Sequence, residues 1–256
     1  MDSWQVTEDT NKVIDRYGDR IARALSVTPR WEDPLGCGSW GCTYPTNEEG
    51  LVVKLTFDAT EGPVCYALMK TALDKNLDGL CRVESTWRLP MAAKATSYGA
   101  PEAYVILRED VQPIEGSEYD QIERLDEMTP ALSAINEYKM LAEDFVWKEH
   151  DMGTTQHQLR FAAQQLNGYN EFRDLHVALL KCMDRGITLV DTHWGNLGMR
   201  KYDWGAQAPK TVRWSDGLEA PPAVLFDYGV SQPPSGVRVP NLPRMLRKNE
   251  TVPVLP

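Results

Sequence analysis

The chain has 256 residues, of which 42% are hydrophobic and 25% are charged, and its formal net charge is −10. Such a chain can form one large globular domain or two lobes with a sizeable core. The negative charge argues against nucleic acid or an anionic membrane as a partner, because both would repel the protein. No apolar run approaches the roughly 18 residues that a membrane-spanning helix needs.

The N-terminal sequence lacks the basic and then apolar profile of a signal peptide. None of the five cysteines forms a C-x-x-C pair, so we expect free thiols in a reducing compartment and a cytoplasmic protein. The four histidines form no closely spaced pair, which argues against a zinc site.

Residues 1–30 are expected to form a helix that packs on the body of the fold, because apolar residues recur there at helical spacing. Segment 35–44 then carries the pattern G-x-G-x-x-G. A dinucleotide-binding turn would continue into a helix, and a Walker A loop would need lysine where Cys42 stands. A turn and the apolar run 51–56 follow instead, which predicts a hairpin. The hairpin either lies over ATP phosphates, with Trp40 folding over the loop, or is an ordinary glycine-rich turn.

Lys54 lies in the apolar run 51–56, and a buried lysine is costly unless its ammonium group meets an anion. Glu61 opens the next predicted helix, with Thr60 as its N-cap, and we expect Glu61 to pair with Lys54. Alternatively, Glu61 is simply an acidic residue in the first turn of the helix, where the helix dipole favours a negative charge.

Two strands are predicted over 86–91 and 103–107, followed by a connector at which an adenine ring could bond to the backbone. Residues 117–185 are expected to be helical, with apolar stripes over 132–145 and 172–183 and a loop over 153–158. The second helical stripe leads to Asp191-Thr192-His193-Trp194-Gly195-Asn196, and a later apolar run delivers Asp227-Tyr228-Gly229. Two carboxylates and an amide on such loops suit Mg²⁺ and phosphate oxygens.

These motifs, in this order from about 35 to 231, resemble the protein-kinase-like superfamily, especially its atypical, small-molecule and bacteriophage-type kinases. The resemblance implies an α+β bilobal fold with a β-rich N-lobe, one helix in that lobe, and a reduced, mainly helical C-lobe. It divides the chain into a helical lead-in (1–30), an N-lobe (31–111), a C-lobe (112–231) and a Pro-rich tail (232–256).

The resemblance also implies roles for individual residues. Asp191 would accept or orient the proton of the attacking hydroxyl, while Asn196 and Asp227 would hold Mg²⁺. Lys54, steadied by Glu61, would contact the ATP phosphates. His193 would orient the loop. The implied nucleotide-binding residues also include Gly36, Gly38, Ser39, Trp40, Gly41, Leu107 and Glu109.

Three features depart from the kinase pattern. Val190 stands where many relatives carry His or Arg, so an anchor of the catalytic loop is missing. An extra polar insertion spans 201–222. It is a strand hairpin, a substrate or partner surface or, in the interpretation we favour, a solvated loop. The Pro-rich tail is either an extended strap across the body or disordered.

The predicted activity is an ATP- and Mg²⁺-dependent serine/threonine kinase that acts on a protein substrate. A small-molecule phosphotransferase of the aminoglycoside- or choline-kinase type is the alternative that the Asp-x-His loop favours. A non-catalytic module that binds a partner protein is the third. The acidic charge is a slight indication of a basic target.

Overall fold

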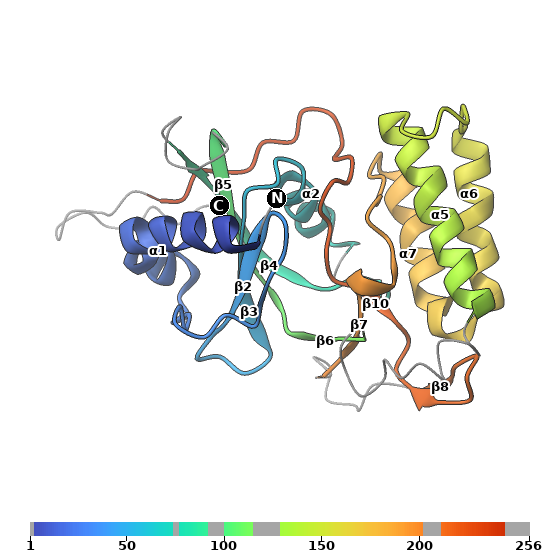
Figure 1. Cartoon of the computed structure of the whole chain (residues 1–256), viewed down its shortest axis with the longest axis horizontal. Coiled ribbons are helices and arrows are strands. Elements are labelled where there is room, and N and C mark those ends of the chain that lie inside the picture. The colour runs from blue at the N-terminus through green and yellow to red at the C-terminus, as the bar shows by residue number, and fades with distance from the viewer. Residues whose placement is uncertain (1–2, 74–76, 92–99, 115–128, 202–210, 244–256) are drawn as a thin grey trace.

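The computed structural model describes residues 3–73, 77–91, 100–114, 129–201 and 211–243 (Figure 1). A β-rich part with two helices is followed by a part dominated by helices, so the predicted α+β fold class is confirmed. None of the helices in the described part of the chain combines the length and apolar character needed to span a bilayer.

The N-terminal part is built on an antiparallel sheet with the strand order β1-β2-β3-β5-β4. Its strands are β1 (Gly36–Cys37), β2 (Gly41–Pro45), β3 (Leu51–Thr56), β4 (Val83–Pro90) and β5 (Glu102–Glu109). Helices α1 (Ser3–Leu25) and α2 (Glu61–Thr71) belong to different apolar clusters beside this sheet. The helix predicted within 1–30 is therefore present and packs on the body of the fold.

Alternation along β5 decides which of its side chains can reach the site. Val105 and Leu107 join the cluster that contains residues of α1, whereas Tyr104 and Ile106 join the cluster that contains residues of α2. Arg108, the next residue on the second face, is buried at the cleft described below. Because successive side chains point to opposite faces of a strand, Leu107 faces away from that cleft.

Three helices dominate the C-terminal part: α5 (Thr129–Trp147), α6 (Gln156–Gln165) and α7 (Arg173–Asp184) (Figure 1). The loop predicted over 153–158 is wrong from Gln156 onward, because α6 begins there. Thr155 and Gln158 form a capping box, in which the Gln158 N–H donates to Thr155 Oγ1 (3.3 Å) and the Thr155 N–H donates to Gln158 Oε1 (2.9 Å). The Thr-x-x-Gln spacing was the sequence signal for this helix start.

A small antiparallel sheet of order β10-β7-β6 carries the predicted catalytic motifs, 191–196 and 227–229. It comprises β6 (Val111–Pro113), β7 (Leu197–Arg200) and β10 (Val224–Leu225). Asn196 immediately precedes β7, and Phe226-Asp227 immediately follows β10. The pairing of β7 with β10 therefore brings the two motifs side by side.

The insertion contains a second small hairpin, of β8 (Val212–Arg213) and β9 (Glu219–Ala220). Trp214 is 2% exposed, donates its indole N–H to Pro221 O (3.1 Å) and packs edge-on against Trp194. The strand-hairpin alternative is therefore confirmed within 211–222, and the favoured solvated-loop interpretation is wrong there, because β8 pairs with β9 and Trp214 is buried. Residues 202–210 lie outside the described part of the chain.

Residues 231–243 form an extended strap from the catalytic region back to the N-terminal sheet (Figure 1). The Arg88 N–H donates to Pro240 O and the Leu242 N–H donates to Arg88 O, each over 2.8 Å. Leu242 is 1% exposed in the cluster that contains residues of α1. The strap alternative is thus confirmed up to residue 243, and residues 244–256 lie outside the described part.

Candidate functional site

A cleft of about 670 Å³ lies where the glycine hairpin, β3, the end of β5 and the catalytic motifs meet. Its lining includes almost all of the predicted site residues: Gly36, Gly38, Ser39, Trp40, Gly41, Lys54, Glu61, Glu109, Asp191, Asn196 and Asp227. Leu107 is the predicted site residue that does not line it. A volume of this size is within the range of small-molecule and cofactor sites.

The hairpin forms one wall of the cleft. A Cβ added to Gly41 would lie 2.0 Å from Leu55 O, so this position requires glycine because β2 and β3 approach closely there. A Cβ at Gly36 or Gly38 would meet nothing within 4 Å. Trp40, at the tip, is 42% exposed. Close packing explains Gly41, and the other two glycines leave open space beside the cleft.

Cys37 and Cys42 form a disulfide across this hairpin, which corrects the expectation of free thiols for two of the five cysteines. Gly38 and Gly41, the next pair toward the tip, share a backbone hydrogen bond, which makes the cysteines a non-hydrogen-bonded pair. Side chains approach closest at such pairs, and the two Cα atoms are 4.1 Å apart. Cys65, Cys81 and Cys182 are free and buried.

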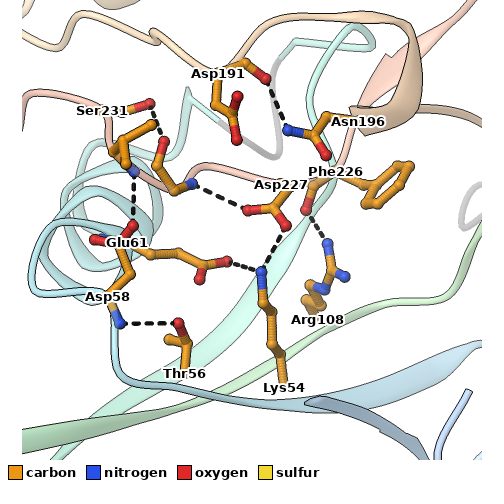
Figure 2. Close-up of polar contacts among 12 residues, drawn as sticks. Lys54, Thr56, Asp58, Glu61, Arg108, Asp191, Asn196, Phe226, Asp227 and Ser231 are labelled. Atoms are coloured by element: carbon orange, nitrogen blue, oxygen red, sulfur yellow. Dashed lines mark hydrogen bonds and ion pairs between the residues drawn. The ribbon is translucent and has the colours of Figure 1, made fainter. Parts of the chain in front are cut away.

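Lys54 forms ion pairs with two carboxylates at once (Figure 2). Its Nζ lies 2.7 Å from Glu61 Oε1 and 2.7 Å from Asp227 Oδ2. The predicted Lys54–Glu61 pair is thus present. Residues from β3, from α2 and from the loop after β10 meet at this ammonium group, so its position depends on both halves of the molecule.

The buried charges shift one another's pKa values. Burial alone would raise the pKa of Asp227, but Lys54 and Arg108 outweigh it and lower that pKa to about 2. Burial raises the pKa of Glu61 to about 7 in spite of Lys54. Burial opposes the charge of Lys54, but Asp227 and Glu61 outweigh it and raise its pKa. Asp227 therefore stays anionic and Lys54 cationic near neutral pH.

Arg108 is a cleft residue that the sequence analysis missed. It is 6% exposed, lies over the Phe226 ring at 5.4 Å from its centroid, and donates from Nη1 to Phe226 O. Its Nε has no hydrogen-bond partner among the described residues. Period-2 alternation from Tyr104 through Ile106 could have placed it on the cleft face. Its guanidinium group anchors the residue just before Asp227.

The loop 191–196, which is the predicted catalytic loop, holds Asp191 and Asn196 together. The Asn196 side-chain amide donates to Asp191 O (2.9 Å). His193 Nδ1 accepts from the Gly195 N–H (3.1 Å), and its Nε2 lies 3.3 Å from Asp191 Oδ1. These contacts place His193 where it can orient the loop and the Asp191 carboxylate.

Ser231 provides an anchor where Val190 lacks the usual side chain. The Val190 N–H donates to Ser231 Oγ (3.0 Å), and the Ser231 hydroxyl lies 3.2 Å from Gly229 O. Tyr228 is fully buried and donates its hydroxyl to Cys81 O (2.8 Å). Ser231 therefore ties the catalytic loop to the turn that carries Asp227, a role that no sequence motif marked.

The connector after β5 is already engaged in backbone pairing. The Glu109 N–H donates to Arg82 O (2.9 Å), and the Asp110 N–H donates to Gly50 O (2.8 Å). The Glu109 carboxylate pairs with Arg200 over 2.9 Å. The backbone N–H groups of Glu109 and Asp110 are therefore already used. A nucleobase at this connector would have to donate hydrogen bonds to backbone carbonyl groups instead.

The side-chain oxygens of Asn196 and Asp227 are suitable ligands for a hard divalent cation. The amide nitrogen of Asn196 is held by Asp191 O, which leaves its amide oxygen on the side of Phe226 and Asp227 (Figure 2). Asp227 offers a carboxylate that stays ionised. Amide and carboxylate oxygens are ligands that Mg²⁺ accepts.

No family model and no curated protein matches the chain. Among solved structures, the kinase PK-1 of Cydia pomonella granulovirus is similar, with 15% sequence identity and a TM-score of 0.39 over 85% of this chain. The chain spans 59% of the length of that kinase. The function proposed below rests on the contacts in the cleft.

Proposed function

We propose that the chain is a kinase that transfers the γ-phosphate of ATP to a hydroxyl group, with Mg²⁺ as cofactor and a protein serine or threonine as acceptor. The observation that carries this proposal is the ammonium group of Lys54, which contacts Glu61 and Asp227 in a cleft also lined by Asp191 and Asn196. This set of groups supplies what phosphoryl transfer needs: cations for phosphate oxygens, oxygen ligands for a metal, and a carboxylate for the nucleophile.

Each residue has one task in this mechanism. Lys54 binds phosphate oxygens, and Glu61 keeps its ammonium group in place. Asn196 and Asp227 would hold Mg²⁺, which supplies charge neutralisation on the phosphates when bound. Asp191 accepts or orients the proton of the acceptor hydroxyl, and His193 fixes its carboxylate. Catalysis is then positioning and charge stabilisation by preorganised groups.

The acidic charge of the chain supports a basic acceptor, such as a basic polypeptide. The chain carries 37 acidic and 27 basic residues, so its field attracts a basic polypeptide and raises the rate of encounter.

The test uses γ-labelled ATP, Mg²⁺ and a mixed cell lysate. Asp191→Asn removes the carboxylate that handles the proton but keeps the size of the side chain, so we expect transfer to fall by roughly 10²-fold or more. Nucleotide binding, measured as a rise in melting temperature with ATP, should persist in the variant. Label on protein with the wild type and none with Asp191→Asn would support the protein kinase.

Two outcomes contradict the proposal in different ways. No labelled protein, together with ATP binding, would favour a small-molecule acceptor or a nucleotide-regulated binding module. Equal labelling by wild type and Asp191→Asn would overturn the role of Asp191.

A further inference from the structure

Asp58, in the turn between β3 and α2, lies in the cleft but belongs to no kinase motif found in the sequence. It is 5% exposed, and its backbone N–H donates to Thr56 Oγ1 (3.2 Å). A buried carboxylate is costly unless hydrogen bonds satisfy its oxygens. The partners of the two oxygens therefore show what Asp58 does.

The first oxygen, Oδ1, caps helix α2. It accepts from the Thr60 N–H (2.7 Å), the Thr60 hydroxyl (2.7 Å) and the Glu61 N–H (3.2 Å). Thr60 occupies the predicted N-cap position but makes no side-chain cap of its own. Asp58 therefore satisfies the free N–H groups of the first turn, where Glu61 begins the helix.

The second oxygen, Oδ2, reaches the other half of the site. It accepts from the Val230 N–H over 2.7 Å, across 172 positions in the sequence (Figure 2). Val230 follows Gly229 and has a φ of 47°, in the left-handed region. A Cβ on Gly229 would lie 3.1 Å from Asp58 Oδ2 and 3.3 Å from Asp227 Oδ1, so a side chain there would crowd both carboxylates.

A helix cap alone needs only one of these oxygens. The second oxygen, Oδ2, binds the Val230 N–H and so holds the adjacent turn, in which the Gly229 N–H donates to Asp227 Oδ1 (3.0 Å). All four hydrogen bonds that Asp58 accepts come from uncharged donors, so this carboxylate works as a fixed pair of acceptors.

We propose that Asp58 is a positioning residue of the phosphotransferase, which joins the start of α2 to the Asp227 turn so that Glu61 and Asp227 meet Lys54 in one arrangement. This inference rests on the function proposed above. One side chain thereby fixes both conditions for transfer, the Lys54–Glu61 pair and the placement of the metal-binding carboxylate.

The test is Asp58→Asn, which keeps the shape and an oxygen able to cap α2. Its NH₂ group replaces the oxygen that accepts from Val230, so that one hydrogen bond is lost. We expect the Val230 amide to exchange with solvent about fivefold to tenfold faster, and α2 amides to stay protected. We also expect kcat to fall roughly 10²-fold and half-saturation by Mg²⁺ to need more metal, with the acceptor KM unchanged.

The matched control is Asp144→Asn. Asp144 is likewise a buried carboxylate and accepts from the Met152 N–H (3.0 Å) and the Thr154 N–H (2.7 Å), in the segment between α5 and α6. The Asp144→Asn variant should be less stable than the wild type, but hydrogen exchange of the Val230 amide and the dependence of activity on Mg²⁺ should not change. Asp58→Ser, which keeps a cap but has no second oxygen, should behave as Asp58→Asn.

Hydrogen exchange of the Val230 amide tests the Asp58–Val230 hydrogen bond even if the wild type transfers no phosphate. A Val230 amide that is unprotected in the wild type, or equally protected in Asp58→Asn, would overturn the proposal. So would faster exchange with unchanged kcat and Mg²⁺ dependence in an active enzyme. A wild type that transfers no phosphate but shows the expected exchange would refute the proposed function and leave the Asp58 link standing.

Discussion

The residues of the cleft work as a group of mutually dependent charges rather than as independent contacts. Lys54 is buried with two carboxylates at 2.7 Å, and the Arg108 guanidinium lies close enough to influence both carboxylates. Removing one member leaves another buried charge without compensation, which is usually more damaging than the loss of the contact itself. Single substitutions in this group should therefore not be additive.

The Lys54–Glu61 pair gives the first prediction in this group. Glu61→Gln should lower kcat/KM by roughly 10-fold to 100-fold, the effect of a coupling of about 1.4 to 2.8 kcal/mol. In a Lys54→Met background, Glu61→Gln should add little, because its partner is already gone. A double-mutant cycle on kcat/KM measures the coupling, and fully additive losses would show that Glu61 acts independently of Lys54.

At the scale of elements, the glycine hairpin is closed by a covalent link at its base. The Cys37–Cys42 disulfide encloses the residues 38–41 that line the cleft. It limits how far the tip can open, while the open space at Gly36 and Gly38 leaves room beside it for a ligand.

This link is tested by counting thiols. Alkylation of the unfolded protein without reductant should modify three cysteines, and five after reduction. Closing so short a ring restricts the unfolded chain, so reduction should lower the free energy of unfolding by about 2 kcal/mol. A Cys37→Ser variant should be insensitive to reductant in the same urea titration, and five modified cysteines in unreduced wild type would contradict the disulfide.

At the scale of the molecule, contacts both inside and outside the cleft join the β-rich and the helical parts. The ammonium group of Lys54 and the carboxylate of Asp58 do so inside the cleft. The strap 231–243 does so on the outside, from Ser231 beside the catalytic loop to Leu242 in the cluster that contains residues of α1. Arg20 also donates to Leu242 O and Pro243 O.

The strap should contribute to global stability. Leu242→Ala truncates a side chain that is 1% exposed, so the free energy of unfolding, measured by urea titration, should fall by about 2 to 4 kcal/mol. Ser235→Ala, at an exposed position of the same strap, should leave the free energy of unfolding nearly unchanged. Equal stability of Leu242→Ala and wild type would show that the strap is not part of the cooperative fold.

By itself the sequence determined the elements and the chemistry of the candidate site. Apolar periodicity located α1, β3 and β5, and the spacing of the charged motifs selected Lys54, Glu61, Asp191, Asn196 and Asp227, which the cleft brings together. Such signals are local, because each depends on the preferences of a few consecutive residues. Local signals were overlooked at α6, where the Thr-x-x-Gln cap was present, and at β5, where alternation places Arg108 on the same face as Ile106.

Tertiary structure alone decided the contacts between residues distant in sequence. The disulfide depended on the register of β1 and β2, and the exclusion of Leu107 in favour of Arg108 depended on which face of β5 meets the cleft. Asp58 reaches Val230, and Ser231 reaches Val190, only after the two halves have packed. No spacing rule reports such contacts, because their geometry is fixed by packing across the whole chain rather than by neighbouring residues.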